Sequence, residues 1–175
     1  MVIVTHEEYT DGMDAVIRIF ADGAVFPVVL IGAYALLYKV PQGGKYEAYC
    51  RVLMAGLTAY LLAKFIGSIY QPSLERPFEM QGVLPGASYL DNPGFPSDHM
   101  LFVAAITLAV WFETRHKILT ASLVVLSLTV GLGRVLALVH APIDIIGGIV
   151  IACIGALWYF TAPGRSLSMR TQKRL

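Results

Sequence analysis

The chain has 175 residues, of which 57% are hydrophobic and 14% are charged, whereas about 25% of residues are charged in ordinary soluble domains. This composition argues against a soluble globular protein and supplies enough apolar sequence for several membrane helices of about 20 residues each. The formal net charge is +1, so the chain lacks the basic surface that nucleic-acid binding requires. We therefore expect a membrane protein with no nucleic-acid partner.

The first predicted element is a short amphipathic helix over residues 5–20. Apolar residues recur there at helical spacing between charged ones, and Thr5 with Glu8 fits a capping box. A helix of this kind is typical of segments that lie in the membrane interface.

Five apolar runs follow, separated by charged residues, proline or glycine. They cover residues 23–40, 50–70, 98–112, 118–139 and 143–162. Each run approaches the length that crosses a hydrocarbon core of about 30 Å. The sequence thus predicts an all-α fold, an integral membrane bundle of about five transmembrane helices, in a single domain over residues 1–175.

Charge is distributed unequally between the two ends of the predicted spans. Basic residues at one end are Lys39, Lys45, Arg51, Arg115 and Lys117, and the C-terminal tail is also basic, while the N-terminal stretch is acidic. Because basic connections favour the cytoplasm, we expect a cytoplasmic C-terminus in a multi-pass protein of the cell (inner) membrane. The polar connections at about 71–97 and 134–143 then face the outer, periplasmic side.

Several ionisable residues fall within the outer halves of the predicted spans. They are Lys64, His99, Arg134 and Asp144. Counted to the first charge near the other end of each span, they are 13 to 21 positions away, about 20 to 32 Å of helix. Because an isolated charge in mid-membrane is costly, these side chains are expected to share a polar cavity. For Lys64 alone, snorkelling to the membrane surface explains its position equally well.

The most informative pair is His140 with Asp144. A separation of four residues places them on one face of a helix, where the carboxylate can hold one imidazole nitrogen while the other faces the cavity. This orientation suits a histidine that acts as nucleophile or base. Pro142 between them fits the first turn of a helix. A simple capping or buried-pair role is the alternative for this spacing alone.

Other residues supply cations and a second histidine. Arg134 and Arg76 carry guanidinium groups suited to phosphate oxygens. Ser97 is a candidate N-cap at the start of the third span, and His99 could donate a proton to a leaving oxygen. A zinc site formed by His99, His140 and Asp144 has enough ligands, but the nearby cations oppose a divalent ion.

Together these segments resemble the three motifs of the type 2 phosphatidic acid phosphatase superfamily, which are Lys-x6-Arg-Pro, Pro-Ser-Gly-His and Ser-Arg-x5-His-x3-Asp. The matching segments are Arg76-Pro77, Pro96-Ser97-Asp98-His99 and Gly133-Arg134-x5-His140-x3-Asp144, so the resemblance spans residues 64–144.

Three positions depart from the family's motifs. Asp98 replaces the glycine of the second motif, and the resulting Pro-Ser-Asp-His resembles the small bacterial undecaprenyl-diphosphate phosphatases. Gly133 replaces the serine of the third motif. Ile69 occupies the place of the motif lysine, and Lys64 is the nearest replacement.

The resemblance implies a role for each candidate residue. His140 would attack phosphorus to form a phosphohistidine, Asp144 would orient it, and His99 would protonate the leaving group and later activate water. The residues implied in substrate binding are Lys64, Arg76, Ser97, Asp98 and Arg134. The resemblance implies neither a metal nor another cofactor.

We therefore expect a membrane lipid phosphatase that hydrolyses a polyprenyl diphosphate to its monophosphate. A phosphatidylglycerophosphate or phosphatidate phosphatase is the first alternative. A non-catalytic lipid-phosphate binder or transporter is the second, although binding alone does not require an oriented nucleophile and an acid.

Overall fold

The computed structural model describes residues 12, 14–92 and 94–160, and in these ranges it contains helices and loops but no strand. The α-helices are α2 (Val25–Tyr38), α3 (Lys45–Ile69), α4 (Pro77–Gln81), α5 (Asp98–Thr114), α6 (Lys117–Leu136) and α7 (Pro142–Gly155). Shorter turns are the π-helical η1 (Ile19–Gly23) and the 3-10 helices η2 (Gln42–Gly44) and η3 (Ala156–Phe160). The prediction of an all-α fold is confirmed.

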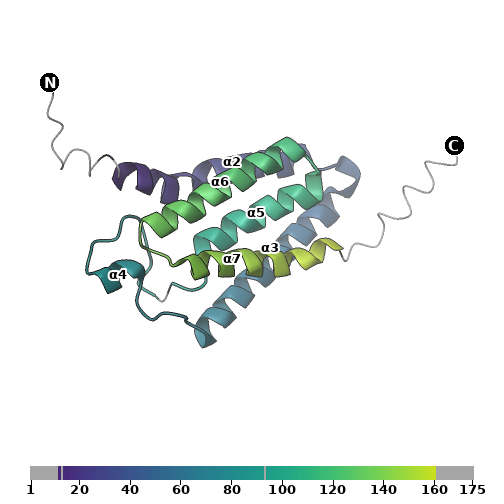
Figure 1. The fold of residues 1–175 in the computed structure, drawn as a ribbon. Coiled ribbons are helices and arrows are strands. Elements are labelled where there is room, and N and C mark those ends of the chain that lie inside the picture. The colour runs from purple at the N-terminus through teal and green to yellow at the C-terminus, as the bar shows by residue number, and fades with distance from the viewer. Residues whose placement is uncertain (1–11, 13, 93, 161–175) are drawn as a thin grey trace, which may run out of the picture.

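The long helices form one bundle, with α4 and its connecting loops at one end (Figure 1). Helix α5 lies at the centre of this bundle, where it packs against α2, α3, α6 and α7. Its inward side chains Val103 and Val110 are fully buried. The helix that begins with the second sequence motif is therefore held by four neighbouring helices.

Within the described ranges, four helical segments are long and apolar enough to cross a membrane. They are Asp14–Tyr38, Gln42–Ile69, Lys117–Leu136 and Pro142–Phe160. Helix α5, which lies in the remaining run of the five predicted, has 17 residues and so a length of only about 26 Å. Four neighbouring helices pack against this short helix, and among its large apolar side chains Phe102 and Trp111 stay exposed.

The bundle places small residues inside and large apolar residues outside. Ala59, Ala63, Ala104 and Ala152 belong to the buried core. Large exposed side chains include Phe26, Leu30, Leu53, Phe65 and Val125. Small residues let membrane helices approach closely, and an outward apolar surface of this extent fits a lipid environment.

Helices α5 and α7 approach each other closely beside the residues of the second and third motifs. A Cβ atom added to Gly148 would lie 2.9 Å from both the backbone nitrogen of Leu101 and the carbonyl oxygen of Ser97. Only glycine at position 148, in the second turn of α7, therefore allows this helix to touch the first turn of α5. This contact joins the second and third sequence motifs.

Two segments differ from the expectation. Half of the predicted interfacial helix over residues 5–20 lies outside the described residues, and its described part from Asp14 continues through η1 into α2 instead of forming a separate element. The connection 71–97 contains the unpredicted helix α4. A carboxylate oxygen of Glu79 accepts a hydrogen bond of 2.6 Å from the backbone nitrogen of Arg76 at its start, and five residues are too few for a periodic pattern to reveal.

Candidate active site

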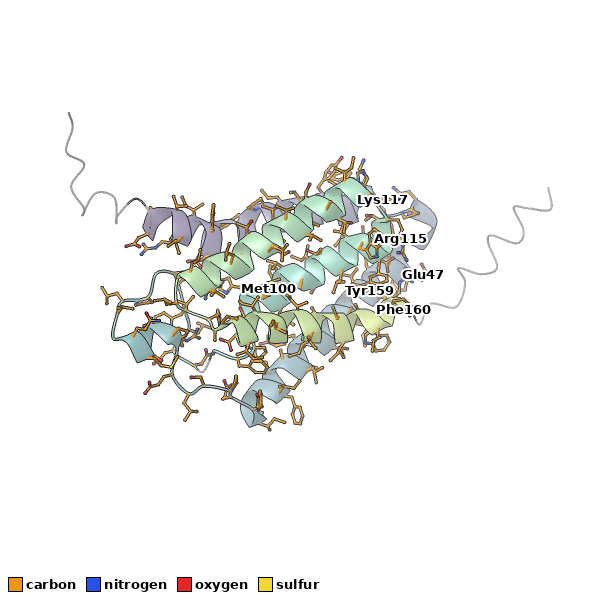
Figure 2. All side chains as sticks on the ribbon, viewed as in Figure 1. Glu47, Met100, Arg115, Lys117, Tyr159 and Phe160 are labelled. Carbon is orange, nitrogen blue, oxygen red and sulfur yellow. The ribbon has the colours of Figure 1, made fainter. Side chains whose placement is uncertain are left out.

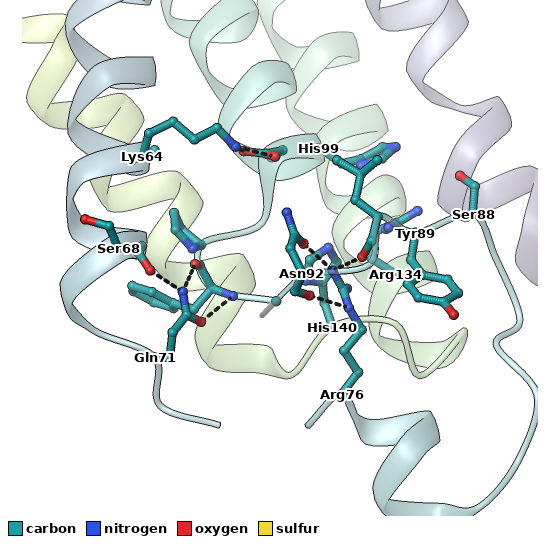
Figure 3. A pocket seen from close by; sticks show the side chains of 17 residues that line it. Lys64, Ser68, Gln71, Arg76, Ser88, Tyr89, Asn92, His99, Arg134 and His140 are labelled. Atoms are coloured by element: carbon teal, nitrogen blue, oxygen red, sulfur yellow. Dashed lines mark hydrogen bonds and ion pairs between the residues drawn. The ribbon is translucent and has the colours of Figure 1, made fainter. Parts of the chain in front are cut away.

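A cavity of about 520 Å³ lies at the end of the bundle that carries α4 (Figure 3). Six of the eight predicted site residues line it, namely Lys64, Arg76, Asp98, His99, Arg134 and His140. They come from α3, the long connection, α5, α6 and the segment between α6 and α7. The structure thus brings together residues that are up to 76 positions apart in the sequence.

His140 and Asp144 form a buried pair at the start of α7. Nδ1 of His140 lies 3.3 Å from Oδ2 of Asp144, and the same oxygen accepts a hydrogen bond of 2.9 Å from the backbone nitrogen of Ala141. Pro142 is the first residue of α7, as predicted. The carboxylate is fixed by the helix start and contacts Nδ1 of the imidazole, which leaves Nε2 as the ring nitrogen that Asp144 does not contact.

Burial lowers the pKa of the His140 imidazole below its ordinary value of 6.5, even though the hydrogen bond to Asp144 opposes this change. The positive charges of Arg134 and Arg76 act in the same direction as burial. A lowered pKa leaves the imidazole neutral near pH 7. A neutral imidazole has the free electron pair that a nucleophile needs.

Ser97 and His99 lie at the N-terminus of α5. Ser97 is the predicted N-cap, and its fully buried hydroxyl accepts a hydrogen bond of 3.4 Å from the backbone nitrogen of Met100. Its own N–H donates to the carbonyl oxygen of Asp144 at 3.1 Å. Ser97 therefore holds α5 against α7, while His99 lines the cavity; a phosphoryl contact by Ser97 stays a prediction.

The two arginines are held in different ways. Arg134 is 1% exposed, and its Nη1 donates to Oδ1 of Asp22 at 2.7 Å. Its buried Nε has no hydrogen-bond partner among the described residues. Arg76 donates instead to the carbonyl oxygens of Val139, Leu90 and Asn92. Both guanidinium groups stand at the cavity wall with fixed directions.

Lys64 is paired with Asp98 across the cavity. Its Nζ lies 2.8 and 2.7 Å from the two carboxylate oxygens of Asp98, and both side chains are about two-fifths exposed. The residue that replaces the motif glycine is thus bound to the residue that we expected to replace the motif lysine. The ion pair gives Lys64 a partner within the protein, and its contact with substrate stays a prediction.

Three residues at the site were not singled out as site residues from the sequence. Asn92 accepts a hydrogen bond of 3.0 Å from Nη2 of Arg76. Asp22 binds Arg134 from the N-terminal part of the chain. A Cβ on Gly94 would lie 3.0 Å from Oδ2 of Asp144, so the loop backbone passes close to the His140–Asp144 pair. A lone aspartate in an apolar stretch was the only available signal for Asp22.

The candidate zinc ligands do not assemble into a metal site. In the part of the chain that the structure describes, no group of three or more histidine, cysteine, aspartate or glutamate side chains could hold a metal ion. His140 and Asp144 bind each other, whereas His99 stands nearer to Asp22, with 3.9 Å between Nε2 and Oδ1. The residues fit anion binding, with three cationic side chains around one cavity.

A family model described as the PAP2 superfamily matches residues 48–167 of this chain. The chain belongs to the PAP2 superfamily. The matched region includes all eight predicted site residues and excludes Asp22. Membership confirms the resemblance inferred from the motifs and makes this PAP2 protein a lipid phosphatase by class.

Named relatives of this PAP2 protein occur in two Bacillus species. The undecaprenyl-diphosphatase BcrC of Bacillus subtilis (strain 168) is 27% identical over 149 residues, which is 85% of this chain and 74% of that protein. The bacitracin transport permease protein BcrC of Bacillus licheniformis is 32% identical over 117 residues, or 63% of this chain and 54% of that protein. No solved structure gives a significant match.

Proposed function

We propose that this protein removes the terminal phosphoryl group of a polyprenyl diphosphate, with undecaprenyl diphosphate as first choice, through a phosphohistidine intermediate and without a metal. The observation that carries the proposal is the buried His140–Asp144 pair in one cavity with Arg134 and His99. The name of the Bacillus subtilis relative supports the choice of substrate.

The first step transfers the phosphoryl group to His140. Its Nε2 forms a bond to the terminal phosphorus, the bond to the bridging oxygen breaks, and that oxygen takes the proton of His99. The polyprenyl monophosphate leaves. Arg76 and Arg134 stabilise the negative charge that spreads over the equatorial oxygens in the transition state.

The second step releases inorganic phosphate. A water molecule gives a proton to His99 and attacks the phosphorus, and the phosphorus–nitrogen bond breaks to restore neutral His140. Asp144 stays ionised in both steps, because its function is to hold the imidazole and balance its positive charge while it carries the phosphoryl group.

Lys64 and Asp98 bear on the choice of a diphosphate. The pair lies at the exposed side of the cavity, and an anion with a second phosphoryl group needs a further cation. We propose that Lys64 exchanges its contact with Asp98 for that group when the substrate binds.

The test is phosphate release by the purified protein in lipid vesicles. Undecaprenyl diphosphate should be hydrolysed faster than phosphatidylglycerophosphate or phosphatidate, and activity should survive EDTA. After rapid quenching of a reaction with radiolabelled substrate, the wild-type protein should carry label that is lost in acid and kept in base. His140→Ala should carry no such label. The matched control is His116→Asn, which removes an imidazole at the far end of α6 and keeps an N-cap residue.

Other results would select the alternatives. Faster release from a glycerolipid phosphate would assign the protein to that substrate class. Tight binding of the lipid without any release of phosphate would favour a binder or transporter, a class to which the name of the Bacillus licheniformis relative points. Loss of activity in EDTA with rescue by zinc would replace the metal-independent mechanism.

A further inference from the structure

Asp22 lies outside the region that the family model matches and contacts two residues that line the cavity, Arg134 and Ser88. Its side chain is 28% exposed, and its Oδ1 lies 2.7 Å from Nη1 of Arg134. The other oxygen, Oδ2, accepts a hydrogen bond of 3.0 Å from the backbone nitrogen of Ser88, and Ser88 itself lines the cavity. The carboxylate is therefore fixed from two sides beside the phosphate-binding arginine.

The backbone around Asp22 is shaped to bring it there. Asp22 lies in η1, a π-helical turn between two α-helical segments, and such turns often occur at functional sites. A Cβ added to Gly133 would lie 2.5 Å from the backbone nitrogen of Ala21 and 2.7 Å from the carbonyl carbon of Phe20. The glycine that replaces the motif serine is thus what allows η1 to touch α6.

Asp22 balances a charge that is otherwise deeply buried. Arg134 is almost fully buried, and Asp22 is the carboxylate with which it forms an ion pair among the described residues. A buried guanidinium without a counter-charge is strongly unfavourable and would turn toward other partners. The ion pair therefore sets the direction of Arg134 before a substrate arrives.

The carboxylate of Asp22 also interacts electrostatically with His99. Burial lowers the pKa of His99 to about 4, and the charges of Arg134 and His140 act in the same direction, whereas Asp22 and Asp98 oppose this change. Asp98 is already bound to Lys64. Asp22, 3.9 Å from Nε2 of His99, is the carboxylate from another element that can help this histidine to keep its proton.

We propose that Asp22 is a positioning residue of the active site, which directs Arg134 toward the phosphoryl oxygens and helps His99 to retain the proton that it donates. This inference rests on the proposed phosphatase function. Asp22 neither receives a proton nor forms a bond to the substrate. In this proposal Asp22 holds Arg134 and His99 in place, just as Asp144 holds His140.

The test compares the pH dependence of phosphate release by the wild-type protein, Asp22→Asn and Asp22→Glu. Asparagine keeps an oxygen for the N–H of Ser88 and removes the charge. We expect kcat of Asp22→Asn to fall about tenfold or more near pH 7, with a smaller change in KM. The basic limb of its pH profile should move to lower pH, because His99 loses its proton more easily. Asp22→Glu keeps the charge and should return the basic limb toward its wild-type pH.

Asp14→Asn is the matched control, since it makes the same chemical change on the same helical segment at an exposed position. It should match the wild type in kcat and in pH profile. An unchanged basic limb in Asp22→Asn would overturn the proposal, whether or not its thermal stability falls. A lower KM with unchanged kcat would overturn it too, since the carboxylate would then only compete with substrate. An inactive wild-type protein would refute the proposed function instead.

Discussion

The two histidines of the cavity differ in burial and in the carboxylate beside them. His140 is nearly inaccessible and lies against Asp144, whereas about a third of the His99 side chain is exposed and Asp22 is its neighbour. A buried, neutral imidazole suits the nucleophile, and a more accessible one suits the group that exchanges protons with the leaving oxygen and with water. These differences in burial and neighbours support the two different functions that we propose for the two histidines.

Substitutions at these residues should affect kcat far more than folding. His140→Ala and His99→Ala should each abolish turnover, and Asp144→Asn should lower kcat by orders of magnitude because the attacking imidazole loses its orientation. Steady-state kinetics together with thermal unfolding of each variant would check this. Retained turnover in His140→Ala would exclude it as the nucleophile.

The pH dependence of kcat/KM tests the protonation state of His140. Because burial lowers the pKa of this residue, the acid limb should lie below pH 6.5 as protonation removes the nucleophile. The hydrogen bond to Asp144 raises that pKa, so Asp144→Asn should move the limb to still lower pH while reducing the rate. A limb above pH 6.5 in the wild type would contradict a neutral nucleophile.

The pair of Lys64 and Asp98 predicts a difference between substrates. If Lys64 meets the second phosphoryl group, Lys64→Met should reduce kcat/KM for the diphosphate by the equivalent of about 1–3 kcal/mol and reduce it less for a monophosphate lipid. Parallel kinetics on both lipids would measure this. Equal losses would place Lys64 on the transferred phosphoryl group, and no loss would remove it from substrate binding.

At the scale of the elements, we expect the contact between α5 and α7 to affect both thermal stability and activity. Gly148→Ala inserts a methyl group 2.9 Å from backbone atoms of Ser97 and Leu101, so the two helix starts must separate. Both the melting temperature and kcat should fall. Gly56→Ala within α3 is the control, because no described atom lies within 4 Å of its added Cβ, and alanine favours a helix. Equal effects of the two changes would refute the coupling.

The helices were largely predictable because apolar runs report on spans directly. The predicted run 98–112 coincides with the start of α5 at Asp98, and the run 118–139 corresponds to α6. Hydropathy does not report how helices join, so the continuity of Asp14 with α2 was missed. Helix α4 was missed because hydrogen bonding by Glu79, and not periodicity, defines its start.

At the scale of the whole molecule, the cavity and the basic connections lie at opposite ends. Arg115 and Lys117 lie together with Glu47 and Phe160 at the end away from α4 (Figures 1 and 2). The charge bias predicts that this end lies in the cytoplasm, and we then expect the cavity to open to the outer side of the membrane.

Cysteine labelling tests this orientation in intact cells, in a variant without Cys50 and Cys153. Leu84→Cys, at a side chain that is 90% exposed in the long connection, should react with an impermeant reagent from outside. Gln42→Cys, in the exposed turn η2 at the other end, should react only after permeabilisation. The reverse pattern would overturn the outward-facing site.

The contact between His140 and Asp144 was predictable from their separation of four residues, although His140 lies in the loop just before α7 and not, as expected, on the same helix. Asn92 and Gly94 were not, because they lie in a loop whose path depends on tertiary contacts with Arg76 and Asp144. Asp22 belongs to the same class, since its partner Arg134 is 112 residues away.

The close approach of η1 to Gly133 has a consequence for sequence evolution. Any side chain at position 133 would collide with the backbone of Phe20 and Ala21, so a motif serine there and this placement of Asp22 exclude each other. Among homologous sequences, glycine at this position should therefore co-vary with an acidic residue in the first helical segment. A motif that looks degenerate would then mark a subgroup whose catalytic site draws on an additional helix.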